Sequence, residues 1–402
     1  MSTPEYQQVL VSVTGRDSPG ITARLLAVVA KSHVALLDIE QVRVHGQLVL
    51  VLLLGMQHDT DDSVVKDLLF EAKALGLGLE LKVMEDDEEV LSTPRRRYAI
   101  TAVADRVEAS ALQVISQVLA EYSINIESIR QLSQGGLGCF EIIAAEIGVH
   151  ERTLDLRRRL LEETADLDID LAVASEDLLR RSKRLVVMDM DSTLIRIEVI
   201  DELARMHGVV DKVSKITERA MAGEIDFAAS LRERVALLKG LDAKKVEELA
   251  ANLPLTEGAE DMLLVLKTLG YKTAVISGGF STAADALKEK LGLDYAYANG
   301  LAVKDGKLTG ELEGPIVTPQ RKADLLDTIA QSEGIGLDQT IAIGDGANDM
   351  AMIEKAGLGI AFHAKAKLRE AADTAVSRGG LDRILFLLGL HARDVDAILK
   401  RG

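Results

Sequence analysis

The sequence predicts an α/β protein in which two small βαββαβ repeats precede a larger domain with a parallel sheet and a helical insertion. Three observations predict this fold class. Apolar, strand-like runs end abruptly in carboxylates at Asp189-Met190-Asp191 and again at Asp345. The first 175 residues alternate strands and helices in the same order twice. Residues 197–253 have helical spacing instead and interrupt the larger sheet.

Composition limits the classes of function. The 402 residues exceed one ordinary domain, and 48% of them are apolar, enough for several cores. The net charge of −17, without a basic stripe, argues against a nucleic-acid partner and means that local positive groups must capture an anionic substrate. Cys139 is the only cysteine, so no intrachain disulfide can form. We find no signal-peptide pattern and no apolar run of the ~20 residues that span a membrane, and we therefore expect a cytoplasmic protein without a membrane partner.

The first repeat is expected over residues 1–90. Its apolar spacing predicts strands over 8–14, 34–44, 47–56 and 79–83 and helices over 21–31 and 63–74. His45-Gly46 provides the turn of a hairpin between the second and third strands. The predicted order is therefore β-α-β-β-α-β.

The second repeat is expected over residues 91–175, with strands over 98–104, 124–132, 137–147 and 167–173 and helices over 109–121 and 154–163. Asp38-Ile39-Glu40 and Asn125-Ile126-Glu127 occupy equivalent places, 87 residues apart. This tandem pattern resembles a pair of ACT domains. The resemblance implies ferredoxin-like folds, an amino acid effector, and pairing of two chains into a homodimer. Between the repeats, Pro94-Arg95-Arg96-Arg97 is either an anion site or a solvated linker.

The turn after the first strand is the candidate effector site, formed by Gly15, Arg16, Asp17, Ser18, Pro19 and Gly20. In ACT domains this turn commonly contains a Pro-Gly pair, and its backbone N–H groups face a ligand carboxylate at the helix N-terminus. A purely structural alternative is open, in which Asp17 or Ser18 caps the helix and Pro19 lies in its first turn. The second repeat has no Pro or Gly here, so the first repeat should supply more of the site.

The larger domain is expected over residues 183–402. Strand patterns cover 185–188, 272–276, 340–343 and 358–362, and a hairpin surrounds Asp305-Gly306. Helical patterns cover 259–269, 281–291 and 381–399, the last with spacing typical of packing against a sheet. The insertion at about 197–253 falls between the first two strands.

Two strand ends supply the candidate chemistry. Asp189 and Asp191 are separated by one residue, so on an extended chain both side chains lie on one face. Asp345 ends a second strand in the same way. Because parallel strands present their carboxyl ends at one edge, these carboxylates should form a hard oxygen pocket suited to Mg²⁺. Mn²⁺ would also fit such a site.

Four motifs in sequence order resemble those of the haloacid-dehalogenase superfamily. Residues 189–193 resemble the first motif, Ser277-Gly278-Gly279 the second, Lys322 the third and residues 344–349 the fourth. Taken singly, Ser277 could be a helix cap and Lys322 a surface lysine. Their order, and their positions at element ends, favour the functional interpretation. The resemblance implies a Rossmannoid parallel sheet with a small helical cap that closes over the site.

The superfamily resemblance also implies roles for these residues. Asp189 would be the nucleophile that accepts the phosphoryl group, and Asp191 the proton donor and general base. The metal ligands would be Asp189, Asp345 and the backbone carbonyl of Asp191. The substrate phosphate would be held by Ser277, Gly278, Gly279, Lys322 and Asn348, with Asp349 in a supporting role.

The helical insertion resembles the cap of the phosphoserine phosphatase family. The shared pattern consists of Asp226, Phe227, Ser230, Leu231, Arg234 and Val235. By that resemblance Glu198 receives the ammonium group of O-phospho-L-serine, and Arg234 its carboxylate. Met221 and Phe227 would cover the apolar side of this small substrate. The alternative is that Glu198 and Arg234 are ordinary surface charges.

The expected function is Mg²⁺-dependent hydrolysis of O-phospho-L-serine to L-serine and phosphate, the last step of L-serine synthesis. L-Serine or another amino acid would regulate it through the repeats. Three alternatives stay open: a phosphotransferase or phosphomutase of the same fold, a phosphatase for another ester such as phosphothreonine or a phosphoprotein, and an amino-acid-sensing protein with a vestigial enzyme domain. The presence of Asp189, Asp191, Lys322 and Asp345 argues against the last of these.

Overall fold

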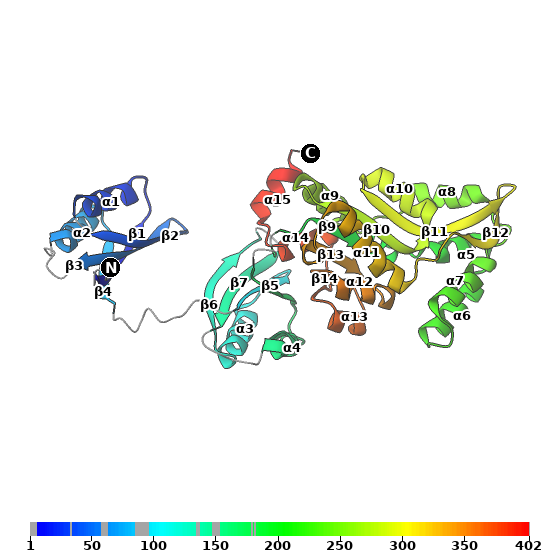
Figure 1. Cartoon of the computed structure of the whole chain (residues 1–402), viewed down its shortest axis with the longest axis horizontal. Helices are drawn as coiled ribbons and strands as arrows, with labels where there is room; N and C mark the ends of the chain where they lie inside the picture. The colour runs from blue at the N-terminus through cyan, green and yellow to red at the C-terminus, as the bar shows by residue number, and fades with distance from the viewer. Residues whose placement is uncertain are drawn as a thin grey trace. The chain divides into compact units, whose positions relative to one another are not determined.

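A computed structural model describes residues 6–32, 34–57, 63–84, 96–133, 137–146, 153–177, 180 and 182–401. The chain divides into two compact units, Met1–Thr93 and Pro94–Gly402. The described strands form a four-stranded sheet in the first unit and an eleven-stranded sheet in the second (Figure 1).

The first unit is an antiparallel sheet with helices on one face. Its strands follow the order β2-β3-β1-β4, with β1 (Tyr6–Arg16), β2 (Ala35–Val44), β3 (Gln47–Gln57) and β4 (Gly78–Val83). Helices α1 (Ile21–Lys31) and α2 (Ser63–Ala74) cover one face (Figure 1). Successive residues of a strand point to opposite faces. Accordingly Leu48 and Leu50 are buried under the helices, whereas Val49 between them is 40% exposed.

The second unit begins with the same βαββαβ order, as predicted. Its elements are β5 (Arg97–Ala104), α3 (Ala109–Glu121), β6 (Ile124–Gln131), β7 (Gly138–Glu146), α4 (Thr153–Glu163) and β8 (Asp170–Ser175). The strands lie in the order β8-β5-β7-β6 and pair antiparallel. The predicted hairpin turn at 134–136 lies outside the described residues.

The larger part of the second unit contains the predicted parallel sheet. From one side to the other its strands are β12 (Lys307–Glu313), β11 (Tyr295–Lys304), β10 (Lys272–Phe280), β9 (Leu185–Met188), β13 (Thr340–Gly344), β14 (Gly359–Phe362) and β15 (Thr374–Val376). Strand β12 is added antiparallel to β11 at one edge, as the predicted hairpin around Asp305-Gly306, whereas the other neighbours in this order pair parallel. Its flanking helices are α9 (Ala259–Thr268), α10 (Ser281–Leu291), α11 (Pro319–Glu333), α12 (Met350–Lys355) and α13 (Ala366–Ala371). Strand β9 is central and wholly buried, which explains its unbroken apolar run.

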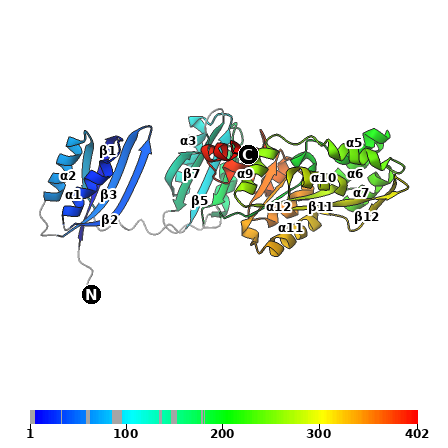
Figure 2. The same cartoon turned by 90° about the horizontal axis from the view of Figure 1, so that it is seen from above.

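The predicted helical insertion forms four helices. They are α5 (Val199–His207), α6 (Val210–Met221), α7 (Phe227–Ala236) and α8 (Ala243–Ala251). Asp226 and Asp242 cap the N-termini of α7 and α8 by accepting hydrogen bonds from the backbone of Ala229 and Lys244. Figure 2 shows α5, α6 and α7 gathered at the β12 end of the unit.

The second repeat and the parallel sheet share one continuous sheet. Thr374 of β15 pairs with Ala172 of β8, and the backbone N of Ala392 donates to the carbonyl of Leu132 at 2.8 Å. Val103 and Cys139 belong to the same apolar core as the carboxyl-terminal helices. The sequence pattern did not predict this joining of the second repeat to the parallel sheet.

The prediction of a single terminal helix over 381–399 is wrong. The structure has a short turn at Leu381–Arg383, helix α14 (Ile384–Leu387) and helix α15 (Ala392–Leu399). Gly389 separates the two helices with a φ of 78°, a left-handed conformation that suits glycine and ends a helix. Among the helices that the structure describes, none is both long and apolar enough to cross a membrane.

Candidate active site

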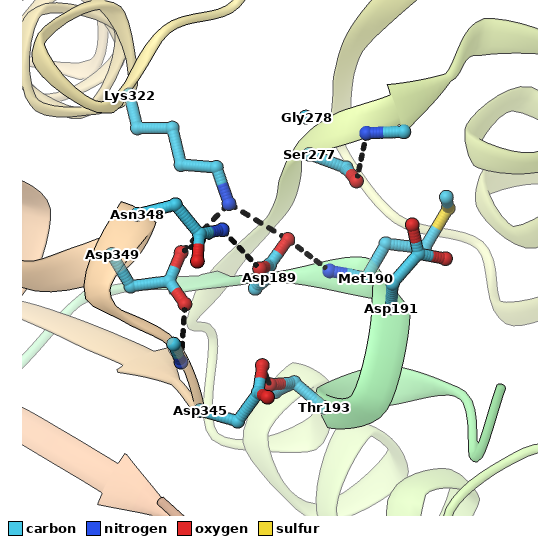
Figure 3. Close-up of polar contacts among 12 residues, drawn as sticks. Asp189, Met190, Asp191, Thr193, Ser277, Gly278, Lys322, Asp345, Asn348 and Asp349 are labelled. Atoms are coloured by element: carbon cyan, nitrogen blue, oxygen red, sulfur yellow. Dashed lines mark hydrogen bonds and ion pairs between the residues drawn. The ribbon is translucent and has the colours of Figure 1, made fainter. Parts of the chain in front are cut away.

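The end of β9 places Asp189 at the centre of a cluster of polar side chains (Figure 3). The chain leaves the buried strand in a tight turn, η2 (Met190–Leu194), and Asp189 is only 3% exposed. Its Oδ1 accepts a hydrogen bond from the backbone N of Met190 at 2.7 Å. Its Oδ2 accepts one from Asn348 Nδ2 at 3.2 Å. The Asp189 carboxylate is therefore held from both sides.

Lys322 of α11 is fully buried beside Asp189, so the alternative of a surface lysine is wrong. Its Nζ lies 2.8 Å from Asp189 Oδ1 and 2.7 Å from Asp349 Oδ1. Burial alone would lower the pKa of Lys322, but the charges of Asp189 and Asp349 raise it above its usual value. The ammonium group therefore stays charged in the interior.

Asp349 orients this lysine and the fourth motif. Its Oδ2 accepts a hydrogen bond from the backbone N of Gly346 at 3.1 Å. Burial and the nearby charge of Asp189 raise the pKa of Asp349, and the ion pair with Lys322 opposes that shift. A side chain at Gly344 would lie 2.5 Å from the Asp349 carboxyl carbon, so this strand end requires glycine.

Asp345 completes a group of three carboxylates. Because β13 pairs directly with β9, the two acidic strand ends are neighbours, as predicted. Carboxylate oxygens of Asp189, Asp345 and Asp349 lie within 4.8 Å of one another. Burial and the charges of Asp189 and Glu198 raise the pKa of Asp345 to about 7. A divalent cation would offset this repulsion, and the all-oxygen donor set suits Mg²⁺.

Asp191 lies within the same turn. The following Ser192 has a φ of 57°, a left-handed conformation that turns the chain sharply. Asp191 Oδ1 accepts a hydrogen bond from the backbone N of Val199 at 3.3 Å. Burial and the charges of Glu198 and Asp189 raise the pKa of Asp191 well above its usual value. The site therefore favours a protonated carboxyl group at this position.

The loop of the second motif is pressed against Asp191 and the cap. Ser277 is 1% exposed, and its Oγ accepts a hydrogen bond from the backbone N of Gly279 at 2.8 Å. A Cβ at Gly278 would lie 2.7 Å from Phe227 Cζ, and one at Gly279 would lie 2.6 Å from Asp191 Oδ2. The next helix begins only at Ser281, so the alternative of Ser277 as its cap is wrong.

The four predicted cap residues differ in their surroundings. Glu198 precedes α5, and its Oε1 accepts a hydrogen bond from Ser192 Oγ at 2.7 Å. Arg234 of α7 is half-buried; burial lowers its pKa, and nearby carboxylates including Glu198 oppose that shift. Phe227 lies over Gly278, whereas Met221 at the end of α6 is 67% exposed. The structure thus brings three of the four toward the site and leaves Met221 outside.

The candidate effector loop lies in the first unit. Helix α1 begins at Ile21, and its N-cap is Gly20 with a φ of 95°. The alternative in which Asp17 or Ser18 caps the helix and Pro19 lies in its first turn is therefore wrong. The carboxylate of Asp17 pairs with Arg43 at 3.0 Å. A Cβ at Gly15 would lie 2.5 Å from Leu77 Cδ2, so a larger residue there would displace the Leu77 side chain. Arg16, Ser18 and Pro19 are exposed.

Two residues of the site were missed by sequence reasoning. Thr193 is fully buried; its Oγ1 donates to Asp345 Oδ1 at 3.2 Å, and its carbonyl accepts from Thr256 Oγ1 at 2.6 Å. Its place inside the first motif was a usable signal. Asn299 is buried beside the second motif, and nothing in its local sequence marks it.

Comparison with protein families agrees with this geometry. Residues 183–357 match the family described as haloacid dehalogenase-like hydrolase. Residues 7–82 and 97–174 each match an ACT domain family.

Individual relatives give the same result. The chain is 42% identical over 401 residues to a phosphoserine phosphatase of Streptomyces coelicolor, which covers 98% of this chain and 95% of the relative. A phosphoserine phosphatase of Methanocaldococcus jannaschii is 51% identical over 207 residues, which cover 52% of this chain and 98% of the relative. A crystal structure of a probable phosphoserine phosphatase from Vibrio cholerae in unliganded form matches with a TM-score of 0.59 and 33% identity, over 79% of this chain and 94% of that one. The chain therefore belongs to the phosphoserine phosphatase family of haloacid dehalogenase-like hydrolases, with two ACT domains ahead of the hydrolase domain.

Proposed function

We propose that this chain hydrolyses O-phospho-L-serine to L-serine and inorganic phosphate, the last step of L-serine synthesis. One observation carries the proposal. The buried Lys322 bridges Asp189 and Asp349 beside a third carboxylate, Asp345, directly under a cap that carries Glu198. The names of the relatives support phosphoserine as the substrate.

Asp189 is the proposed nucleophile. One of its carboxylate oxygens attacks phosphorus, the bond from phosphorus to the serine oxygen breaks, and an aspartyl-phosphate forms. Water then attacks that phosphorus and releases inorganic phosphate. The hydrogen bonds from Met190 and Asn348 and the ion pair with Lys322 hold the carboxylate ready for attack, with little freedom to lose in the transition state.

Asp191 is the proposed proton donor and general base. The raised pKa keeps a proton on Asp191 when substrate binds. That proton passes to the serine oxygen as it leaves. The resulting carboxylate then removes a proton from the attacking water, so one residue serves both steps.

The phosphoryl group would be held by residues of three motifs. The Ser277 hydroxyl, the backbone N–H of Gly278, the Lys322 ammonium and the Asn348 amide are the proposed donors. Gly279 would contribute to this site by shaping the loop, because its N–H already donates to Ser277 Oγ. Asp349 supports them by holding Lys322 at 2.7 Å. Mg²⁺, or Mn²⁺ in its place, would be held by Asp189, Asp345 and the backbone carbonyl of Asp191, and would offset the repulsion between the nucleophile and the phosphate.

The cap would select the serine part of the substrate. Arg234 presents a planar guanidinium group to the substrate carboxylate, and Glu198 pairs with its ammonium group. Phe227, already in contact with the second motif, covers the apolar side. Met221 would join it only after the cap moves toward the sheet, because its side chain is exposed here.

Regulation is the second part of the proposal. We assign regulation to residues 1–90 and 91–175 and catalysis to residues 183–402. L-Serine or another amino acid would bind at Gly15, Arg16, Asp17, Ser18, Pro19 and Gly20, and two chains would pair as a homodimer through the ACT domains. The exposed position of this turn at the start of α1 supports a ligand site there.

The test is phosphate release from O-phospho-L-serine with Mg²⁺, for the wild type, Asp189→Asn and Arg234→Ala. We expect Asp189→Asn to lose activity by at least about 1,000-fold, because the nucleophile is absent. Arg234→Ala should lose phosphoserine turnover but keep turnover of an aryl phosphate, which lacks the carboxylate. A wild type that turns over aryl phosphate, phosphothreonine or a phosphopeptide in preference to phosphoserine would contradict the substrate assignment.

A further inference from the structure

The amide of Asn299 connects two parts of the candidate site. Asn299 lies in β11 and is 1% exposed. Its Nδ2 donates to the carbonyl oxygens of Gly278 at 2.8 Å and of Gly279 at 3.2 Å, and its Oδ1 accepts from the backbone N of Val317 at 2.8 Å. Carbonyl oxygens only accept and an N–H group only donates, so these partners fix the orientation of the amide.

The Ser277 loop leaves the sheet beside this amide. The pairing of β10 with β11 steps from Ile276 opposite Tyr297 to Phe280 opposite Asn299. Three residues of β10 therefore lie opposite a single residue of β11, as in a bulge. A bulge takes carbonyl groups out of the ladder, and the two N–H groups of Asn299 bind two of them.

The bond to Gly278 also sets the direction of the next N–H group. In a trans peptide the C=O and the following N–H point in opposite directions. Because Asn299 holds the carbonyl of Gly278, the N–H of Gly279 points away from Asn299, and it donates to Ser277 Oγ. Ser277 Oγ thus accepts a hydrogen bond within the loop, and its own hydroxyl hydrogen is directed elsewhere, toward a phosphoryl oxygen when one is bound.

The other side of the amide controls the start of α11. Val317 directly precedes Thr318, the N-cap of that helix, whose Oγ1 accepts from the backbone N of Arg321. The carbonyl of Thr318 accepts from the backbone N of Lys322 at 3.0 Å. Asn299 is therefore linked through two hydrogen bonds to the turn that carries Lys322.

We propose that Asn299 is a positioning residue for phosphoryl transfer, which sets the spacing between the Ser277 hydroxyl and the Lys322 ammonium. Figure 3 shows these two groups on either side of Asp189. Asn299 touches neither substrate nor metal in this scheme and acts through the loop and the helix. The inference rests on the proposed phosphatase reaction, although not on phosphoserine as its substrate.

The test compares three variants of the full chain. Asn299→Asp is nearly isosteric but turns an oxygen toward a carbonyl, and Asn299→Ser keeps one short donor. Asn252→Asp is the matched control, because this exposed amide donates only to the carbonyl of Glu248 on a cap helix. The measurements are kcat and KM for phosphoserine and an aryl phosphate, and binding of inorganic phosphate with Mg²⁺ by calorimetry.

At pH 7.5 we expect Asn299→Asp to lower kcat/KM for both esters by about 100-fold, as misplaced groups near reacting atoms do. Asn299→Ser should lower it by about tenfold, and Asn252→Asp by less than about twofold. Affinity for inorganic phosphate should fall in the same order. These losses should appear under conditions in which circular dichroism shows every variant folded.

A pH profile separates positioning from a general folding defect. The buried carboxyl of Asn299→Asp can donate a hydrogen bond to one carbonyl only when it is protonated. The activity of this variant relative to wild type should therefore rise as the pH falls from 8 to 6. Asn299→Ser has no such group, and its activity relative to wild type should stay constant over the same range.

Two outcomes would decide against the proposal or against its context. If both Asn299 variants fold, melt at lower temperature, and keep kcat/KM and phosphate affinity within twofold, Asn299 is structural only and the proposal is wrong. If Asn299→Asp does not fold, the proposal is tested with Asn299→Ser alone, through its kcat/KM and its affinity for inorganic phosphate, and values within twofold of wild type contradict it. If the wild type cleaves the aryl phosphate but not phosphoserine, the substrate assignment fails while the aryl phosphate and phosphate binding still test Asn299.

Discussion

The two ACT domains have the same order of elements but opposite surroundings. In the first, helices cover one face of the sheet, and Val49 on the other face is 40% exposed. In the second, both faces of β5 are covered. Ile100 and Ala102 face α3 and α4, whereas Val103 packs into the core shared with the carboxyl-terminal helices and is 2% exposed.

The strand registers make this contrast visible at single positions. Matching the bulges of the β2–β3 and β6–β7 ladders places Thr14 of β1 and Val103 of β5 at equivalent positions, 89 residues apart. Thr14 is exposed, whereas Val103 is buried. Asp105, in the loop that corresponds to the candidate effector turn, pairs with Arg383 at 2.6 Å. In the second domain, the sheet face away from α3 and α4 and the loop that carries Asp105 therefore both contact the hydrolase domain. The first is the one whose loop stays available for a ligand.

The largest expected effect comes from removing each domain in turn. A chain that begins at residue 96 should fold and retain Mg²⁺-dependent phosphatase activity within a few fold. A chain that begins at residue 183 uncovers the apolar surface that Val103, Leu132 and Cys139 cover, and should lose on the order of 5 kcal/mol of unfolding free energy or aggregate. Urea unfolding and size-exclusion chromatography would measure both.

This prediction has a demanding counterexample. The relative from Methanocaldococcus jannaschii aligns over 98% of its length with only 52% of this chain, so it is too short to contain counterparts of both repeats and of the whole hydrolase domain. A phosphoserine phosphatase of this family can therefore be about half as long as this chain. If the chain beginning at residue 183 unfolds at the same urea concentration as the chain beginning at residue 96, the second domain is a removable module like the first.

A matched pair of substitutions sharpens the comparison. Val103→Arg places a charge in the shared core and should lower the unfolding free energy by about 3–5 kcal/mol. Thr14→Arg places the same charge at the equivalent exposed position of the first domain and should change the unfolding free energy by less than about 0.5 kcal/mol. Equal losses for both variants would show that the two faces are covered alike.

The sequence predicted separate elements better than their assembly. Asp189, Asp345 and Lys322 could be placed because strand ends and motif order carry their signal, and parallel pairing then brings them together. Helix α13 and strand β15 were missed because each is short, six and three residues, and has no strong period. Strand β15 joins the parallel sheet to the second repeat by pairing with β14 on one side and β8 on the other. Asn299 was missed because its partners come from loops that are distant in sequence.

A buried ion pair marks the same junction. Arg180 lies between Glu141 of β7 and Glu176, at 2.6 Å from each, and its side chain is 7% exposed. In the first domain Arg24 and Glu71 form an exposed pair. Arg180→Gln leaves buried carboxylates without their cation and should cost about 2–4 kcal/mol, whereas Arg24→Gln should cost less than about 1 kcal/mol.

Urea unfolding of the two glutamine variants measures this difference. The unfolding transition that Arg180→Gln shifts should be the one that also reports loss of phosphatase activity. An effect of Arg180→Gln as small as that of Arg24→Gln would mean that water reaches Glu141 easily, and that the junction is looser than its buried surface indicates.

The smallest expected effect is a response to pH that only the second unit should show. Asp345 has a pKa of about 7 when folded, above the ~4 of an unfolded aspartate. Between these values the folded state holds a proton that the unfolded state has released, so metal-free stability falls as the pH rises through 7. Because Asp345 is partly exposed, we expect a loss of only about 1 kcal/mol between pH 5.5 and 7.5.

Asp345→Asn should reduce that pH dependence, and the remainder should come from Asp191 and Asp349, whose pKa values are also raised in the folded state. Saturating Mg²⁺ should reverse the dependence in the wild type by favouring the carboxylate of Asp345. The unfolding of the two units should be followed separately. The first unit serves as the internal control, because Asp189, Asp345 and Asp349 all belong to the second unit. If the second ACT domain is part of the hydrolase core, its transition must shift with pH and Mg²⁺ together with the site, while that of the first unit stays constant. If the second ACT domain instead melts at a temperature that does not depend on Mg²⁺, it unfolds independently of the hydrolase domain despite the shared sheet.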